Sequence, residues 1–131
     1  MAYNDPAQRS VMRFETRRYA SRCEEQARNI ERADTLREVA RLSTVHLPSN
    51  LQGAEEAREA QRRLLIAAEQ KAKDLVAEHI AAWIKAEPER RDKLRSQMND
   101  DWANLSGPLG HLRTWAQRQF TAAEQSQGLG L

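Results

Sequence analysis

The sequence predicts an all-α protein: a long antiparallel helical hairpin, about residues 5–45 and 51–86, with two shorter helices at about 88–105 and 108–124. Three observations predict this class. No segment shows the alternation of apolar and polar residues that is typical of a strand. Pro and Gly cluster at only three internal breaks, and between these breaks apolar residues recur at helical spacing. Two long helices joined by a short loop form a hairpin. The 131 residues suit one domain, with 125–131 expected to be a frayed tail.

The apolar residues are unusually small for a globular core. Leu, Ile, Val and Phe together number 23, whereas Ala alone supplies 20. Such a composition indicates disorder when the net charge is high, but here the net charge is only +2 and both signs are interspersed. We therefore expect long, thin, Ala-rich helices that pack in the manner of a coiled coil. Such helices would complete their burial by self-association, as a homodimer.

The first helix is expected to begin at Asp5-Pro6, because Asp caps free amide groups and Pro suits a first turn. No Pro or Gly follows until about Leu42. One face of this helix carries a stripe of Met12, Tyr19, Ala20, Cys23, Ala27 and Ile30. After Ala33 the apolar positions move to another face of the helix. Either the helix bends near Ala33–Asp34, or its two halves pack against different neighbours.

The second helix follows a break at residues 46–53 and contains the most apolar stretch of the chain, Leu75–Ile84, in which eight of ten residues are apolar. A helix that is apolar nearly all round is buried on several sides. Ten residues are too few to span a bilayer, which needs about 20, so no membrane partner is expected. The predicted core or self-association residues are Leu75, Val76, His79, Ile80, Trp83 and Ile84.

The last two helices are predicted from Pro88 and from the Ser106-Gly107-Pro108 break. The first of them carries the stripe Leu94, Met98, Trp102 and Leu105. The second carries Leu109, Leu112, Trp115, Ala116, Phe120 and Ala123. Because large aromatic areas dominate such contacts, we expect Trp102 and Trp115 to pack these helices onto Ile80, Trp83 and Ile84.

Catalytic and metal-binding patterns are sparse. His46, His79 and His111 are far apart in sequence, and there is no His-Glu-x-x-His spacing, Cys pair or Gly-rich phosphate loop. We therefore expect no metal, no cofactor and no enzymatic activity. A small helical enzyme would require His79, an acid and Cys23 to meet in one pocket. His79 is instead expected to be a core histidine with a hydrogen-bonded ring, or else a protonation switch.

The N-terminal helix carries the strongest charge asymmetry. Between Arg9 and Arg22 there are five Arg and one acid, Glu15, so this window is about +4 while the rest of the chain nets about −2. An aromatic side chain among Arg residues is typical of an interface hot spot. Phe14 could instead be covered by the C-terminal helices, or the face could bind nucleic acid. The predicted partner-binding residues are Val11, Phe14, Arg13, Arg17, Arg18 and Arg22.

These patterns favour a non-catalytic helical module that binds another protein to regulate, inhibit or scaffold it. The alternative is a nucleic-acid-binding accessory protein that uses the Arg-rich N-terminal helix. A single Cys23 and an N-terminus without a basic-then-apolar signal indicate a cytoplasmic protein. In general type the chain is similar to many accessory proteins of bacterial plasmids and phages. No motif carries that likeness, and no residue role is transferred from it.

Overall fold

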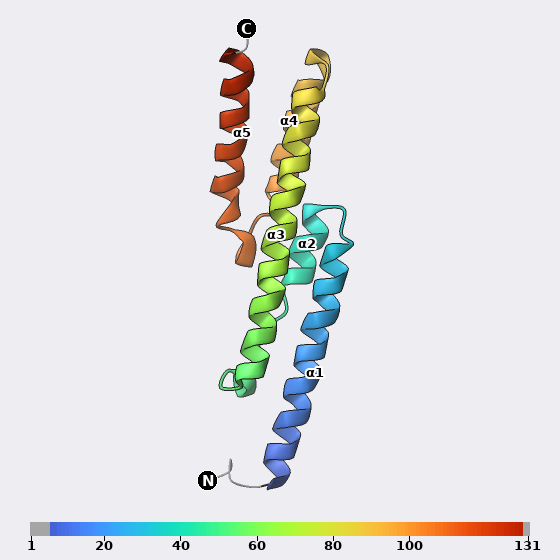
Figure 1. The fold of residues 1–131 in the computed structure, drawn as a ribbon, viewed down its shortest axis with the longest axis vertical. Coiled ribbons are helices and arrows are strands. Elements are labelled where there is room, and N and C mark those ends of the chain that lie inside the picture. The colour runs from blue at the N-terminus through green and yellow to red at the C-terminus, as the bar shows by residue number, and fades with distance from the viewer. Residues whose placement is uncertain (1–5, 130–131) are drawn as a thin grey trace.

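The computed structural model describes residues 6–129, Leu129 by its backbone alone, and every regular element in this range is helical. The elements are α1 (Pro6–Glu31), α2 (Leu36–Ser43), the 3-10 turn η2 (Ser49–Leu51), α3 (Glu55–Lys85), α4 (Pro88–Trp102), the 3-10 turn η3 (Gly107–Leu109) and α5 (Leu112–Leu129) (Figure 1). The predicted all-α class is confirmed. The predicted start at Asp5 lies outside the described residues.

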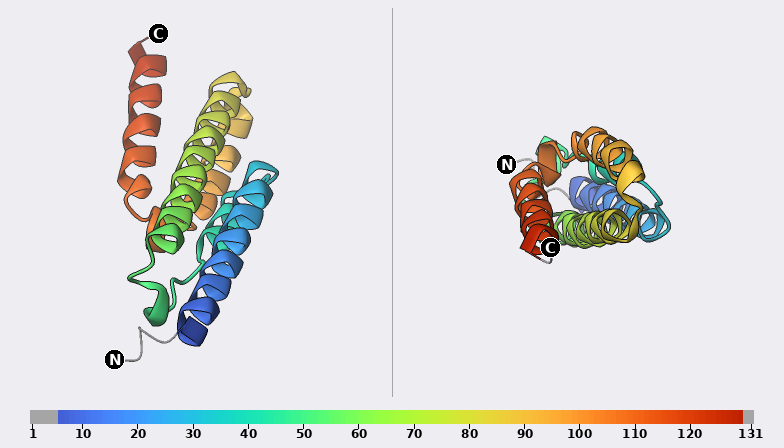
Figure 2. Two further views of the ribbon diagram at one scale, coloured as in Figure 1. Left: turned by 60° about the horizontal axis from the view of Figure 1, so that its bottom comes forward. Right: turned by 90° about the horizontal axis from the view of Figure 1, so that it is seen from above.

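Helix α3 is the central element of the fold. Its 31 residues span about 46 Å at 1.5 Å per residue. Helices α1 and α2 pack against its first half, and α4 and α5 flank its second half (Figures 1 and 2). The result is an elongated bundle in which both halves pack against the same helix, α3. Among residues 6–129, no helix is both long enough and apolar enough to cross a membrane.

The two long helices lie side by side, as predicted, but they run in the same direction (Figure 1). Nδ2 of Asn50, in η2 just before α3, lies 2.7 Å from a carboxylate oxygen of Glu15, in the third turn of α1. Farther along, Nζ of Lys71 donates to the backbone carbonyl of Glu31 at 3.1 Å. The predicted antiparallel pairing of 5–45 with 51–86 is therefore wrong for α1. Of the two helices within the predicted segment 5–45, only α2, which runs back toward η2, packs antiparallel to α3.

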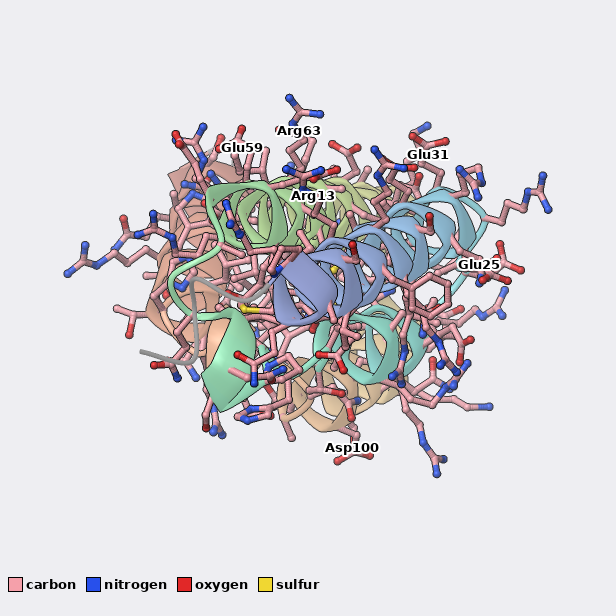
Figure 3. The ribbon with its side chains drawn as sticks, turned by 90° about the horizontal axis from the view of Figure 1, so that it is seen from below. Arg13, Glu25, Glu31, Glu59, Arg63 and Asp100 are labelled. Carbon is pink, nitrogen blue, oxygen red and sulfur yellow. The ribbon has the colours of Figure 1, made fainter. Side chains whose placement is uncertain are left out.

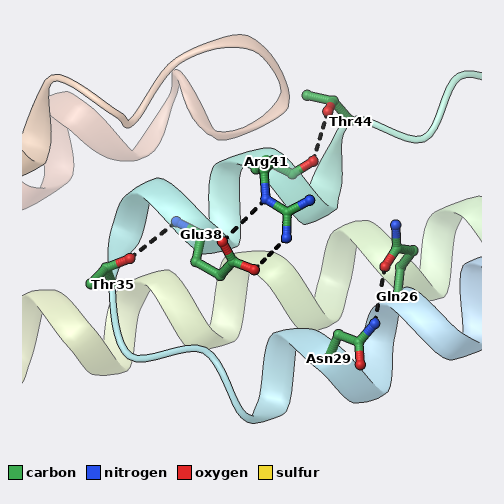
Figure 4. A network of polar contacts seen from close by, with 6 residues as sticks. All are labelled: Gln26, Asn29, Thr35, Glu38, Arg41 and Thr44. Carbon is green, nitrogen blue, oxygen red and sulfur yellow. Dashed lines mark hydrogen bonds and ion pairs between the residues drawn. The ribbon is translucent and has the colours of Figure 1, made fainter.

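The chain reverses at residues 32–35, so the predicted helix 5–45 is two helices. The turn coincides with the Ala33–Asp34 site where the apolar stripe rotates. Thr35 has an extended backbone (φ −133°, ψ 152°), and its Oγ1 accepts from the amide of Glu38 at 3.2 Å. An N-cap of this kind satisfies an amide that a new helix leaves free. Glu38 also pairs with Arg41, which strengthens the short α2 (Figure 4).

Aromatic side chains hold α4 and α5 to the second half of α3. The ring of Phe120 meets Trp83 edge-on at 4.9 Å between centroids and Trp102 edge-on at 5.9 Å. Trp83 and Trp102 are 5% and 3% exposed. The predicted burial of Trp102 is thus confirmed, whereas Trp115 is half-buried at the edge of α5. Edge-to-face pairs of this geometry add specific attraction to the area they bury.

The ends of the last helices differ from the predicted ones. Helix α4 ends at Trp102, three residues early, and α5 continues to Leu129 rather than ending at 124. Arg91 accounts for part of the longer α5, because its guanidinium lies 2.9 Å from the carbonyl of Ile84 and 3.5 Å from Oε1 of Gln127. One side chain of α4 therefore contacts the end of α3 and the last turns of α5. Residues 130–131 of the predicted tail lie outside the described range.

Candidate functional site

The outer face of α1 exposes two large apolar side chains. Phe14 is 65% exposed and Val11 is 55% exposed. The face of α1 that packs into the bundle consists of Thr16, Tyr19, Ala20, Cys23 and Ile30. At 100° per residue Phe14 falls opposite the centre of that buried face. The alternative in which the C-terminal helices cover Phe14 is therefore wrong, because α4 and α5 lie along the other half of α3.

Four arginines surround these apolar side chains without internal partners. Arg13, Arg17, Arg18 and Arg22 are all exposed, and none forms a hydrogen bond or ion pair with any residue that the structure describes. We name the set Val11, Phe14, Arg13, Arg17, Arg18 and Arg22 the α1 outer surface. Arg13 and Arg17 lie on the α3 side of this surface, and Arg18 and Arg22 lie on its η2 side. The six predicted partner-binding residues thus share one accessible surface.

Several basic side chains elsewhere on the protein do form ion pairs. On α3, Glu59 pairs with Arg62 at 2.8 Å, and Glu69 pairs with Lys73 at 3.3 Å. On α4, Arg95 pairs with Glu124 of α5. Each of these bases has an acid within three or four residues or on a packed neighbour. Arg18 and Arg22 also have acids three residues away, Glu15 and Glu25, but form no ion pair with them. The single acid in the basic window of α1, Glu15, instead accepts from Asn50 at 2.7 Å.

The N-terminal turns of α1 extend past the start of α3 (Figure 1). Residues 6–14 are exposed except for the half-buried Met12. Charged side chains fan outward around this end of the molecule, with Arg13 near the α3 side and Glu25 away from it (Figure 3). Helical stability in proteins comes mainly from packing of an amphipathic face. Around Val11 and Phe14 this end of α1 has little packing against the rest of residues 6–129, which leaves these side chains exposed.

The predicted self-association residues divide into covered and open ones. Leu75, Val76, Ile80 and Trp83 are buried within the chain, which agrees with the core alternative for these four. His79 is half-buried, and its Nδ1 has no hydrogen-bond partner among the described residues, contrary to the hydrogen bond expected there. Ile84 is 37% exposed. Other parts of the same chain thus cover most of the apolar side chains of Leu75–Ile84, without a second copy of the protein.

An apolar groove of about 430 Å³ remains between the second half of α3 and α5. The α3 wall includes the predicted second ridge, Ala77, Ile80, Ala81 and Ile84. The α5 wall includes Trp115, which stacks under Nζ of Lys73 at 5.8 Å from the ring centroid. Both Ile80 and Ile84 line this groove, and Ile80 is 9% exposed whereas Ile84 is 37% exposed. The ridge is therefore only partly covered by the C-terminal helix.

Cys23 and His79 do not meet. Cys23 is 1% exposed and lies against Ala60 and Leu64 of α3. His79 is fifteen residues beyond Leu64, about 22 Å along the helix. Burial raises the pKa of the Cys23 thiol, which disfavours the thiolate that a nucleophile requires. Within residues 6–129 no group of three or more His, Cys, Asp or Glu side chains is placed to hold a metal ion.

One exposed apolar residue, Ile66, was not predicted from the sequence. It is 59% exposed on the solvent face of α3. Its position gives the signal that could have identified it, because it lies off the face that carries Leu64 and Ala68, both fully buried. Ile66 has no unpaired arginine cluster around it, since Arg62 and Arg63 both pair with Glu59. Ile66 is therefore a matched control for the exposed apolar residues of α1.

Comparison with protein-family models, with curated proteins and with solved structures found no significant match to this chain.

Proposed function

We propose that this protein is a non-catalytic, protein-binding accessory module whose contact site is the α1 outer surface. Binding there would regulate, inhibit or scaffold the partner. The observation that carries the proposal is Phe14, 65% exposed among four arginines that have no acid partner in the described chain. Aromatic and Arg side chains are the residue types that dominate binding energy at protein interfaces.

The lone, buried Cys23 supports a cytoplasmic site of action, where thiols stay reduced.

Nucleic acid is the second candidate ligand, because four unpaired guanidinium groups also suit phosphates. The surroundings favour protein instead. Glu24 and Glu25 follow the basic window on α1. Glu55 and Glu56 lie opposite Arg13 and Arg17, across a second groove between α1 and the start of α3. These carboxylates would repel a polyanion that extended beyond a few phosphates. A protein partner can restrict its acidic groups to the basic part of the surface.

Site-specific photo-crosslinking tests the proposal. With p-benzoylphenylalanine in place of Phe14, irradiation in the native host is expected to give a discrete protein adduct, identified by mass spectrometry. The same probe at Ile66, also exposed but on α3, is the matched control and should not give that adduct. The Phe14 adduct should disappear when Arg17→Glu and Arg18→Glu are added.

Two results would count against protein binding at this surface. The absence of any adduct at Phe14, or the same adducts at both positions, would reject the α1 outer surface as the contact site. An adduct that nuclease treatment removes would favour the nucleic-acid alternative. Because Phe14 contributes nothing to the buried core, loss of folding does not complicate the comparison.

We also propose that the protein self-associates as a homodimer through the α3–α5 groove. The exposed Ile84 and the apolar lining of the groove support this contact. Light scattering at micromolar concentration is expected to give twice the chain mass of 15.0 kDa, and Ile84→Glu should give the monomer mass. The control Ile66→Glu should remain dimeric. A wild-type mass of 15.0 kDa under these conditions would refute the dimer.

A further inference from the structure

We infer that the partner of the α1 outer surface presents an acidic amphipathic helix, which packs along α1 as one more helix of the bundle. This inference rests on the proposed function and specifies the chemistry of its partner. It follows from the spacing of the exposed residues, from their charge, and from the way the surface ends.

The spacing on α1 is that of a helix–helix contact. Val11, Phe14 and Arg18 follow one another at intervals of three and four residues, and Arg22 continues the row after four more. Residues at such intervals form one ridge on a helix, and the ridges of one helix fit the grooves of another. The ridge from Val11 to Arg22 covers about 17 Å of axis. That length matches three turns of a partner helix.

The charge of the ridge changes along its length. Its free end is apolar, with Val11 and Phe14 exposed, and its other end is cationic, with Arg18 and Arg22 on the ridge and Arg17 beside it. A complementary helix would place apolar side chains opposite Phe14 and carboxylates opposite the guanidinium groups. Arg is well suited to this, because its planar fork binds a carboxylate through two hydrogen bonds.

A second copy of this chain fits the surface poorly. Two α1 outer surfaces packed against each other would bring two windows of about +4 together, and like charges across an interface are strongly unfavourable. The surface also ends on acids, since Glu24 and Glu25 follow Arg22. The acidic stretch of the partner is therefore expected to be short and to end where α1 turns acidic.

Fluorescence anisotropy with designed peptides tests this chemistry on the full chain. The probe is a labelled helix of three heptads with Leu at positions a and d and Glu at e and g. A matched peptide carries Lys at e and g, polyglutamate of equal length lacks the apolar face, and a duplex DNA oligomer represents phosphate. We expect micromolar binding of the Glu peptide, at least about tenfold tighter than each of the other three ligands.

Two variants define the contact. Phe14→Ala should weaken Glu-peptide binding by about tenfold or more, as truncation of a hot spot does. Arg17→Glu with Arg18→Glu should abolish Glu-peptide binding and create binding of the Lys peptide. The matched control is Arg62→Glu with Arg63→Glu, the adjacent arginine pair on the exposed face of α3, which should leave Glu-peptide binding within about twofold.

The outcomes separate this inference from the proposed function. Equal affinity for the Glu and Lys peptides, unchanged binding after Phe14→Ala, or tighter binding of DNA would overturn the acidic-helix partner. So would failure of the Glu peptide to bind at low salt. If any of these occurs while the protein adduct at Phe14 persists, the site stands and only the partner chemistry is wrong. If the adduct is also absent, both proposals are wrong.

Discussion

Replacing Phe120 with Ala is expected to lower the free energy of unfolding by about 3 to 5 kcal/mol. Phe120 is 8% exposed and makes edge contacts with Trp83 and Trp102, so its removal leaves a cavity between α3, α4 and α5. The guanidinium of Arg95 lies 5.2 Å from the same ring and would lose that contact too. Urea denaturation followed by far-UV circular dichroism measures the loss.

Phe14→Ala is the matched control, because Phe14 and Phe120 are the two phenylalanines of the chain. It deletes the same atoms from a side chain that is 65% exposed, so it should change stability by less than about 0.5 kcal/mol. Equal destabilisation by the two variants would contradict the packing described for α5. The pair also separates stability from binding, since only Phe14→Ala is expected to affect the partner.

Leu64→Ala is expected to cost about 2 to 5 kcal/mol, the second largest effect. Leu64 is fully buried where α1 and α3 pack, and the side chains around it include Ala20, Ala27 and Ala60. Small neighbours cannot move far enough to fill the space left by a deleted isobutyl group. The cavity should therefore persist and the cost should lie in the upper part of the range.

Ile66→Ala is the control for Leu64→Ala, because Ile66 lies two residues farther along the same helix. It removes a comparable branched side chain from a position that is 59% exposed, and its effect should stay below about 1 kcal/mol. Thermal unfolding monitored by circular dichroism compares both with the wild type. If Leu64→Ala were no more destabilising than Ile66→Ala, the close parallel packing of α1 on α3 would be wrong.

Much of the secondary structure could be predicted because its signals are local. Pro48, Pro88 and Pro108 mark breaks that the structure contains, since Pro cannot continue a helix beyond its first turn. The buried stripe of α1 was predicted from the spacing of Tyr19, Cys23 and Ile30. The break at residues 32–35 was harder to predict from the sequence, because it contains neither Pro nor Gly and depends on the cap supplied by Thr35.

The candidate site was predicted as a set of residues, but not as an exposed surface. Helical spacing placed Phe14 and its arginines away from the buried stripe of α1. Spacing alone left open whether α4 and α5 would fold over them. That depends on where the aromatic cluster of Trp83, Trp102 and Phe120 anchors these helices. The cluster holds them at the far half of α3, so Phe14 stays exposed.

The sequence by itself determined the helical class, most breaks, and which side of each helix is apolar, because these depend on residues within a few turns of one another. The tertiary structure decided the parallel sense of α1 and α3, the cover over Leu75–Ile84, and the open α1 outer surface. Those outcomes depend on a four-residue reversal between Glu31 and Leu36 and on contacts between residues that are far apart in the chain. Periodicity records the side that a helix buries and carries no information about the neighbour that covers it.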